Sequence, residues 1–247
     1  MVDYGLITKN DDGGTQIDST FQNFVLQEQK SVTIDINHQV DNYHVAETIP
    51  IIPSTIPPLV AMRTFSNRLI ALLGYTMQNN IYNGIKVTSG PRYNNWRYQT
   101  SFDYIVGRGI TSTPSGGYGL SVWASDGKVC FNSNYKYLKI LSSHSFELPT
   151  PNPYTGNYPY VDIYHPNIYN PYYILTPNWA GLGTAEYTGG PPPNHFAAIV
   201  QMTVGLRSLS SESVRIQSFD FGGFWRQGYP IPSIFWNGPF TLLTCTV

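Results

Sequence analysis

Metal binding or acid–base catalysis would first be expected at the five histidines, which are scattered along the chain. His38 and His44 lie an even number of residues apart and could share one face of a strand. The residues around them do not complete a zinc set of cysteine, histidine and carboxylate ligands. The chain also lacks the Gly-x-Ser-x-Gly elbow, the P-loop, the Rossmann glycine fingerprint and the His-Glu-x-x-His motif. The sequence therefore predicts no metal site and no cofactor, with the histidines in loops or facing solvent.

Two aspartates are the best candidates for a catalytic acid. Asp103 and Asp220 each follow a phenylalanine and precede another aromatic residue. Such surroundings can raise the pKa of a carboxyl group by desolvation, and a glycan-cleaving enzyme needs two placed carboxylates. The alternative, which we favour, is an outward strand residue beside inward aromatic rings. Cys130 has no histidine nearby in the sequence to activate it as a nucleophile. We expect no catalytic residue, and thus a non-enzymatic protein.

The segment from Pro149 to His195 is rich in proline, tyrosine, asparagine and glycine, and it is the best candidate for a contact surface. Tyrosine side chains give large, rigid contact areas, which suit protein interfaces and sugar stacking alike. The candidate contact residues are Tyr154, Tyr158, Tyr160, Tyr164, Tyr169, Tyr172, Tyr173 and Trp179. Packing of these tyrosines onto their own domain is an equal alternative. A smaller candidate surface comprises Arg92, Tyr93, Trp96 and Arg97, which a turn entering a strand would also explain.

Composition restricts the class of protein. Only 12% of the 247 residues are charged and 15% are aromatic, with 22 Gly and 19 Pro, which argues against disorder and suits short strands joined by turns. The net charge of −1, without a run of Lys or Arg, argues against a nucleic-acid partner. The longest apolar stretch, Leu69 to Gly74, is too short to span a membrane, and we expect no secretory signal at Met1. Cys130 and Cys245 are expected to be buried free thiols in a protein assembled in a reducing cytoplasm.

An internal repeat is the strongest pattern in the sequence. The segment from Tyr4 to Phe21 aligns without a gap on the segment from Tyr118 to Tyr135, with six identical residues. Each copy has an Asp-Gly pair between two alternating segments, Asp12-Gly13 and Asp126-Gly127, which predicts a β-hairpin. A self-similarity of this kind indicates a duplicated structural unit.

A second similarity lies downstream in each half. Ser101-Phe102-Asp103-Tyr104 matches Ser218-Phe219-Asp220-Phe221 at an offset of 117, close to the 114 of the hairpins. The two matches together predict a tandem duplication, with one half over residues 1–113 and the other over residues 114–247. Residues 149–195 have no evident counterpart in the first half and are predicted to be an insertion that makes contacts.

Many short segments with frequent turns predict an all-β fold, an antiparallel β-sandwich with two related halves. The expected strands cover residues 31–37, 59–64, 69–76, 81–89, 97–106, 138–142, 196–204, 213–221 and 239–246. The segment from Ile49 to Pro58 contains four prolines, so we expect an edge strand or a linker there.

The two hairpins resemble small virion proteins encoded among the tail genes of tailed phages and prophages. Those proteins open on Tyr-Gly-Leu near the N-terminus and contain a second Tyr-Gly-Leu…Gly…Phe-Asp-Ser unit in the middle. The counterparts here run from Tyr4-Gly5-Leu6 to Ile17-Asp18-Ser19 and from Tyr118-Gly119-Leu120 to Phe131-Asn132-Ser133, with Asn132 where the family has Asp. The likeness covers less than half of the chain and leaves out residues 149–195. It implies a structural role at a tail tip, baseplate or fibre, with no catalytic residues.

We therefore expect a virion protein assembled in the host cytoplasm, present in several copies and bound to other phage tail proteins. Edge strands, prolines and tyrosine-rich loops can make wide interfaces without covalent chemistry. The first alternative is a receptor-binding, lectin-like module that contacts host surface glycan through the tyrosine segment. A head decoration or head fibre protein is the second alternative, and a polysaccharide-degrading enzyme is the last.

Overall fold

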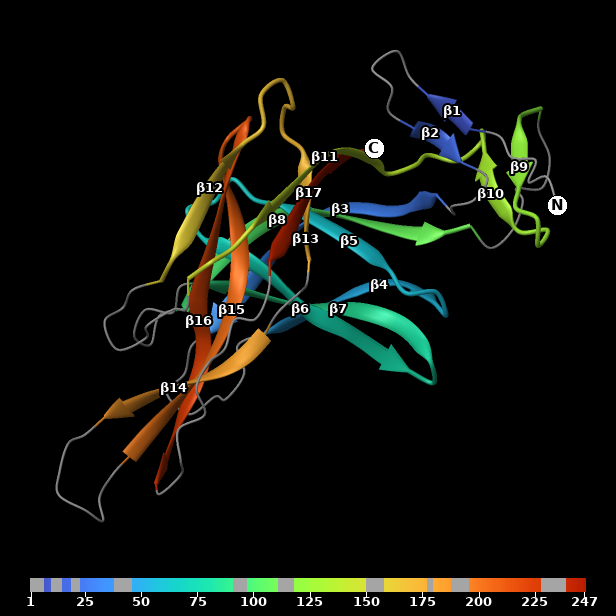
Figure 1. Ribbon diagram of the computed structural model, residues 1–247. Helices are drawn as coiled ribbons and strands as arrows, with labels where there is room; N and C mark the ends of the chain where they lie inside the picture. Colours follow the sequence, from blue (N-terminus) through green and yellow to red (C-terminus); the bar gives the residue numbers. More distant parts are fainter. Residues whose placement is uncertain are drawn as a thin grey trace.

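The computed structural model describes residues 7–9, 15–18, 23–37, 46–90, 97–110, 118–149, 158–176, 180–187, 196–227 and 239–247. For residues 7–9, 15–18, 37, 97–98, 180–187, 196–202 and 220–227 only the course of the backbone is described. Throughout these stretches the chain forms strands joined by turns, with no helix, so the predicted all-β class is confirmed (Figure 1). None of the described residues forms a helix long and apolar enough to cross a membrane.

Two antiparallel sheets make up the body of the molecule. The six-stranded sheet has the order β11-β17-β13-β5-β8-β3. Its strands are β3 (Phe24–Asn37), β5 (Leu59–Arg63), β8 (Arg97–Gly109), β11 (Lys139–Phe146), β13 (Tyr172–Thr176) and β17 (Phe240–Thr246). The seven-stranded sheet has the order β12-β16-β15-β6-β7-β4, with β14 paired to β15. Its strands are β4 (Glu47–Ser54), β6 (Leu69–Gln78), β7 (Ile81–Gly90), β12 (Tyr160–Tyr164), β14 (Ala180–Tyr187), β15 (Phe196–Ser210) and β16 (Ser213–Gln227).

One hydrophobic core lies between the two sheets. Alternate residues along each strand point inward, as in β8, where Phe102 and Tyr104 are buried and Asp103 lies on the opposite face. The core combines inward side chains from both sheets and both halves of the chain, including Ile34, Val60, Ile85, Leu206, Ile216 and Leu242. The molecule is therefore a β-sandwich whose main core is shared by both halves of the chain.

The proline-containing strand β4 lies at an edge of the seven-stranded sheet, as predicted. Ile49 and Ile51 point into the core, whereas Pro50 and Pro53 are exposed. The pairing with β7 is irregular between Pro50 and Ser54, because proline has no N–H to donate to a ladder. An edge position removes the need for that donor.

A buried carboxylate links β4 to the six-stranded sheet. The carboxylate of Glu28 in β3 accepts hydrogen bonds from the Tyr104 hydroxyl and, at 3.0 Å, from the backbone N–H of Ile52. Lys30 Nζ lies 2.9 Å from Glu28 Oε1, and Arg108 Nη2 donates to the Ile52 carbonyl at 2.6 Å. Burial alone would raise the pKa of Glu28, but these hydrogen bonds hold it below the ordinary value.

Two small hairpins lie at one end of the sandwich, and they pair in the same way (Figure 1). They are β1 (Ile7–Lys9) with β2 (Thr15–Asp18) and β9 (Ser121–Trp123) with β10 (Val129–Asn132). The first pairs Ile7–Asp18, Thr8–Ile17 and Lys9–Thr15, and the second pairs Ser121–Asn132, Val122–Phe131 and Trp123–Val129. Every position differs by 114, and the register shift falls at the same place in both. The predicted hairpin unit is thus present twice.

The equivalence extends to both sheets. The first half contributes β3-β8-β5 to one sheet and β4-β7-β6 to the other, and the second half contributes β11-β17-β13 and β12-β16-β15 in the same arrangement. The halves meet where Met62 pairs with Tyr173 and where Ile70 pairs with Leu206. Among the described strands of the sheets, only β14 has no counterpart. A tandem duplication would produce this arrangement, and it stays our prediction.

The second sequence similarity does not join equivalent strands. Residues 101–104 belong to β8 of the six-stranded sheet, whereas residues 218–221 belong to β16 of the seven-stranded sheet. Phe102 packs in the main core, while Phe219 packs with Leu69 and Ala71 in a separate cluster. By pairing, the counterpart of β8 is β17, so this alignment was wrong in register and in strand.

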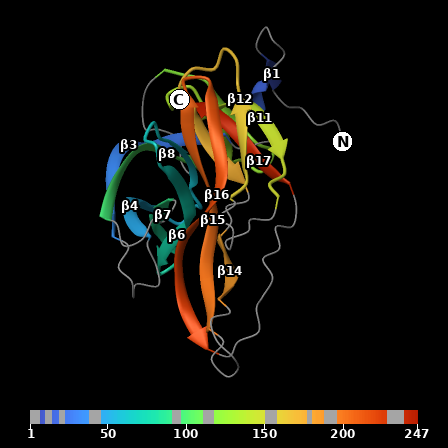
Figure 2. The same ribbon diagram turned by 90° about the vertical axis from the view of Figure 1, so that its left-hand side faces the viewer.

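The proline- and tyrosine-rich segment 149–195 is not wholly an insertion. Its strands β12 and β13 occupy the places that β4 and β5 occupy in the first half, and β13 lies in the middle of the six-stranded sheet. These strands belong to the scaffold, which corrects our expectation that the segment only makes contacts. β14 extends the sandwich together with the distal parts of β15 and β16, and in both views these three strands project beyond the rest of the body (Figures 1 and 2). We call them the arm.

The six-stranded sheet curls so that the beginnings of its two edge strands meet. Leu26 N donates to the Lys136 carbonyl at 2.7 Å, Leu138 N donates to the Phe24 carbonyl at 2.9 Å, and Val25 bridges to Tyr137. The curled outer face encloses a second, smaller core of Ala61, Ile105, Tyr172, Ile174 and Cys245. Side chains farther along this outer face are polar, and they form the site described below.

Candidate functional site

The residues of the Tyr-Gly-Leu motif close the base of the second hairpin. Leu120 N donates to Ser133 Oγ at 2.9 Å, and Ser133 N donates to the Leu120 carbonyl at 2.9 Å. A Cβ on Gly119 would lie 2.5 Å from Ser133 Oγ, so glycine is needed for this close approach. The motif therefore has a structural explanation in the second copy.

Asn132, where the resembled family has aspartate, is buried and bonded through both ends of its amide. Its Nδ2 donates to Ser121 Oγ at 2.8 Å and its Oδ1 accepts from Asn134 N at 2.9 Å. The Tyr137 hydroxyl contacts the backbone of Asn132 and its ring stacks on Phe131 at 5.0 Å. The polar groups of the hairpin thus find their hydrogen-bond partners within the hairpin and in the residues that follow it.

Three apolar or aromatic side chains of this hairpin remain in solvent. Tyr118 is fully exposed, and Leu120 and Trp123 are 51% and 54% exposed. They contrast with Val122 and Cys130, which are buried. Of these three, tyrosine and tryptophan are residue types enriched at interface centres.

The predicted tyrosine contact residues divide into two groups. Tyr160, Tyr164 and Tyr169 are exposed, and Tyr160 and Tyr164 lie on the outer face of β12, because Ile163 between them points into the core. Asp162 shares that face and forms two hydrogen bonds of 2.7 Å with Arg215, whose guanidinium lies 4.0 Å from the Tyr160 ring. The hydrogen bonds from Arg215 hold the pKa of Asp162 below its ordinary value.

Tyr172 and Tyr173 are buried, with 5% and 1% of their surfaces exposed, so these two pack largely on their own domain, the alternative that the sequence left open. The Tyr173 hydroxyl lies 2.7 Å from His165 Nε2, and His165 Nδ1 lies 3.0 Å from the Ile168 carbonyl. His165 is itself buried and lies just after β12, outside the strands, so it is one of the loop histidines that we expected. Desolvation raises the pKa of the Tyr173 hydroxyl above its ordinary value. This pair is part of the scaffold.

The remaining predicted contact residues are only partly described. Tyr158 is half-buried, and its carbonyl accepts a hydrogen bond of 3.1 Å from Gln217. Arg97 begins β8, where only the backbone is described. Tyr154, Trp179, Arg92, Tyr93 and Trp96 lie outside the described residues, as do His38, His44 and His195.

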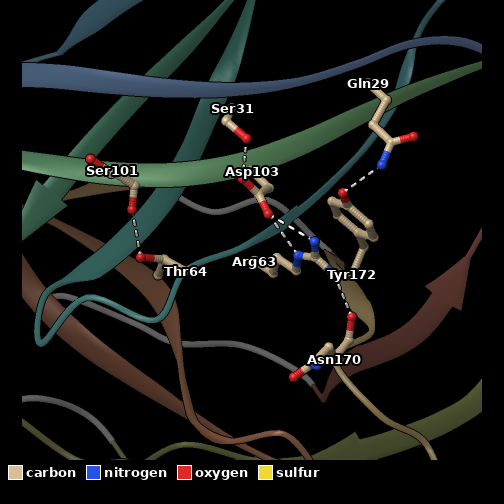
Figure 3. Close-up of polar contacts among 8 residues, drawn as sticks. All are labelled: Gln29, Ser31, Arg63, Thr64, Ser101, Asp103, Asn170 and Tyr172. Atoms are coloured by element: carbon tan, nitrogen blue, oxygen red, sulfur yellow. Dashed lines mark hydrogen bonds and ion pairs between the residues drawn. The ribbon is translucent and has the colours of Figure 1, made fainter.

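The polar part of the curled sheet centres on Arg63, which the sequence did not single out (Figure 3). Arg63 Nε and Nη2 each lie 2.9 Å from Asp103 Oδ2, and Nη1 donates to the Asn170 carbonyl at 2.7 Å. The Arg63 guanidinium lies 4.3 Å from the Tyr172 ring, and Gln29 Nε2 donates to the Tyr172 hydroxyl at 3.1 Å. Side chains of β3, β5, β8 and β13 are thereby fixed on one face.

Hydroxyl groups continue this cluster along β3 and β8. Ser31 Oγ donates to Asp103 Oδ1, and Thr33 Oγ1 lies 2.7 Å from Ser101 Oγ. Thr64 Oγ1 donates to the Ser101 carbonyl at 2.9 Å. Each of these hydroxyl groups has a hydrogen-bond partner, so its position on the face is defined by the protein itself.

Two cavities open on this face and share Arg63. One, of about 490 Å³, is lined by Ser31, Thr33, Thr64, Phe65, Ser101 and Asp103, among others. The other, of about 520 Å³, is lined by Leu26, Gln29, Tyr135, Lys136, Tyr137, Lys139, Tyr172, Thr246 and Val247, besides Arg63. We call the two cavities together the groove.

No family model, curated protein or solved structure matches this chain.

The structure does not bring together Asp103 and Asp220, the two candidates for a catalytic acid. Asp103 is bound by Arg63 and Ser31, and Asp220 lies on the other sheet, where its side chain is not described. Cys130 and Cys245 are buried free thiols, as predicted, and burial raises the pKa of the Cys245 thiol to about 12. Among the described residues, no three His, Cys, Asp or Glu side chains come together to hold a metal ion. The arrangement is suited to binding through side chains.

Proposed function

We propose that this chain is a non-enzymatic structural component of a tailed-phage particle, located at the tail tip, baseplate or fibre attachment. It acts through protein–protein interfaces and is present in several copies beside other tail proteins. The proposal combines the resemblance at the two hairpins with the exposed apolar side chains that the second hairpin carries.

The exposed side chains of the second hairpin are the observation that carries the proposal. Tyr118, Leu120 and Trp123 contribute little to the fold, since the hairpin is held by backbone pairing, Asn132 and Ser133. Large exposed apolar groups favour association, because contact with a partner removes their surface from water. Tyrosine and tryptophan are also the residues most enriched where interfaces depend on a few side chains.

The edge strand β11 and the arm are two further elements that could contact other proteins during assembly. β11 is an edge strand of the six-stranded sheet, and Ile140 and Leu141 on it are about half exposed. An edge strand has backbone N–H and C=O groups that can pair with another chain. The arm projects from the sandwich and offers a second element for contacts (Figure 2).

Incorporation into particles tests the proposal. We expect the triple variant Y118S/L120S/W123S to unfold at the wild-type temperature and to be at least tenfold depleted from purified particles, measured by quantitative mass spectrometry. The matched control is M77S/I81S, which removes exposed apolar side chains at the β6–β7 turn and should be incorporated normally. Wild-type amounts of the triple variant in particles would refute the hairpin as the interface, and absence of the wild-type chain from particles would refute the virion assignment.

Gold labelling of the chain on intact particles distinguishes the tail from the head. Label at the tail end is expected. Label over the head would instead support a head decoration or head fibre protein.

A lectin-like module is the second candidate, favoured by the exposed tyrosines of β12. Tyr160 and Tyr164 flank Asp162 on one outer face, an arrangement that could stack on sugar rings and bind their hydroxyls. It predicts that Y160A/Y164A abolishes binding to host surface glycan. If such particles adsorb normally while assembly of the variant is impaired, the tyrosines of β12 belong to an interface and this candidate is excluded.

A further inference from the structure

We propose that the groove on the curled six-stranded sheet is a binding site for an acidic saccharide, a sugar chain that carries carboxylates. In this site Lys136 and Lys139 bind a carboxylate, tyrosine rings flank a sugar ring, and Gln29 with the Arg63–Asp103 pair binds hydroxyls. The site is distinct from the second hairpin and from the tyrosines of β12.

The shape of the site follows from the curl of the sheet. Because the beginnings of β3 and β11 meet through backbone hydrogen bonds, the cavity of about 520 Å³ has walls from both edges of the sheet. Its floor includes Arg63 of β5 and Tyr172 of β13, which are fixed by Asp103 and Gln29. A cavity of this size accommodates a small ligand or two or three sugar rings of a longer one.

The charged side chains that line this cavity are cationic. No side chain in its lining is acidic, whereas Arg63, Lys136 and Lys139 are cationic. The charge of Arg63 is offset by Asp103 next to it, but neither lysine has an ion-pair partner among the residues that the structure describes. Both lysines are exposed, so their ammonium groups are accessible to a carboxylate.

The neutral groups of the groove match the rest of a sugar. Tyr137 is held by stacking on Phe131 and by bonds to the backbone of Asn132, so its ring is placed in advance. From Arg63 the second cavity continues along the hydroxyls of Ser31, Thr33 and Ser101. Aromatic faces beside planar amide, carboxylate and guanidinium groups bind the apolar face and the vicinal hydroxyls of a pyranose.

A peptide is a poorer fit for the same groove. Bound peptides commonly add a strand to a free sheet edge, using the backbone for affinity. The floor strands β5, β8 and β13 each have paired neighbours on both sides, so their backbone groups are already used. Recognition in the groove therefore depends on side chains, and these have the chemistry of saccharide binding.

The charged pair at the centre of the site differs from its counterpart in the second half of the chain. Arg63 pairs with Asp103 in β5 and β8, and the corresponding pair in β13 and β17 is Thr176 with Thr241. If the fold needed a charged pair at this position, we would expect both halves to have one. The charged pair is thus specific to the groove side.

The test is a titration of the purified full-length chain with acidic and neutral sugars. The probes are trigalacturonate, sialyllactose and a hyaluronan tetrasaccharide, compared with galactotriose and lactose, by isothermal calorimetry and saturation-transfer NMR. We expect at least one acidic probe to bind at least tenfold more tightly than the neutral sugars, with affinity falling as salt rises. Failure of all three acidic probes, or equal binding of a hexaglutamate peptide, would overturn the proposal.

Variants locate the binding. K136Q/K139Q should weaken binding of the acidic probe about tenfold or more, while K86Q/K128Q removes two exposed lysines elsewhere and should not. Y160A/Y164A should bind as the wild type does, which separates the groove from the lectin-like candidate. Equal loss in both lysine variants would show a general charge effect and refute the groove. Incorporation into particles is measured separately, so either proposal can fail without the other.

Discussion

Glu28 is a carboxylate inside the sandwich that depends on four neighbours for its charge. The Tyr104 hydroxyl, the Ile52 N–H and Lys30 contact it, and the Arg108 guanidinium bonds to the carbonyl of Ile52. Burial raises the pKa of the Tyr104 hydroxyl, so the proton stays on Tyr104 and the charge stays on Glu28. Burial also lowers the pKa of the Arg108 guanidinium. Together these contacts join an edge strand of one sheet to the other sheet.

Glu28 should make stability depend on acid pH. Its pKa is below the ordinary value in the folded protein, so its contribution is present above the unfolded pKa of about 4.3 and is lost as pH falls through the folded pKa. We expect E28Q to be less stable than the wild type by about 2 kcal/mol at pH 7 and by less at pH 3, measured by urea unfolding. D126N, which alters an exposed pair with Lys128, is the control and should leave unfolding unchanged. A constant difference between pH 7 and pH 3 would contradict this role.

Phe219 occupies space that two glycines leave on the outer face of the seven-stranded sheet. A Cβ on Gly90 would lie 2.0 Å from the Phe219 ring, and one on Gly205 would lie 2.5 Å from it. The ring itself is fully buried. A larger residue at either glycine would force this ring to move.

A double-mutant cycle tests this packing. We expect G90A to destabilise the protein by about 1–3 kcal/mol through overpacking and F219L to destabilise it through a cavity. G90A/F219L should cost less than the sum of the two, since the smaller side chain makes room for the new methyl group. Strictly additive changes in thermal or urea unfolding would show that the contact is unimportant.

The sequence patterns predicted well on which face of a sheet a residue lies. They predicted poorly which residues lie beside it on the neighbouring strands. The alternation around Asp103 placed it opposite Phe102 and Tyr104, which the structure confirms. Arg63 could not be paired with Asp103, because that contact depends on the register of two strands 40 residues apart. The only feature of the sequence that pointed to Arg63 was its position at the end of an apolar strand.

At the level of elements, the two hairpins provide the clearest test of equivalence. Asn132 in the second corresponds to Asp18 in the first, because both pair with the residue 11 positions earlier. Aspartate at 132 keeps the acceptor for Asn134 N and can accept a hydrogen bond from the Ser121 hydroxyl.

We expect N132D to unfold within about 0.5 kcal/mol of the wild type. N132L removes both side-chain bonds and should cost about 2 kcal/mol, since Asn134 N–H loses its acceptor. Chemical denaturation followed by tryptophan fluorescence checks both, because Trp123 lies on this hairpin. Equal loss in N132D and N132L would show that the hairpins differ in how their ends are held.

Two of the strands that the sequence did not predict, β12 and β13, lie in a segment rich in proline and tyrosine. Nine strands were expected near their observed places, and the hairpins matched the Asp-Gly signal. β12 and β13 were taken for an insertion, because Tyr172 and Tyr173 in a proline-rich context resemble a loop while they pack in the cores. Burial depends on the neighbouring strands β5 and β17, which local sequence does not contain.

For the whole molecule, one core across both halves implies one cooperative unit. We expect I85V in β7 to cost about 1 kcal/mol and to raise exchange of the most protected amides about fivefold, in β16 of the second half as well as in β7. Hydrogen exchange with mass spectrometry measures both strands in one experiment. An increase confined to the first half would show two independently unfolding domains.

In the first half, β5 and β8 carry the charged pair Arg63–Asp103. The corresponding positions of β13 and β17 in the second half carry the neutral pair Thr176–Thr241. In an assembly of two identical chains, every substitution appears twice, and a site gained on one copy must be tolerated on the other. Two equivalent halves in one chain escape that restriction. The Thr176–Thr241 pair can stay neutral while Arg63 and Asp103 carry opposite charges, so a change at one place does not have to be tolerated at the other.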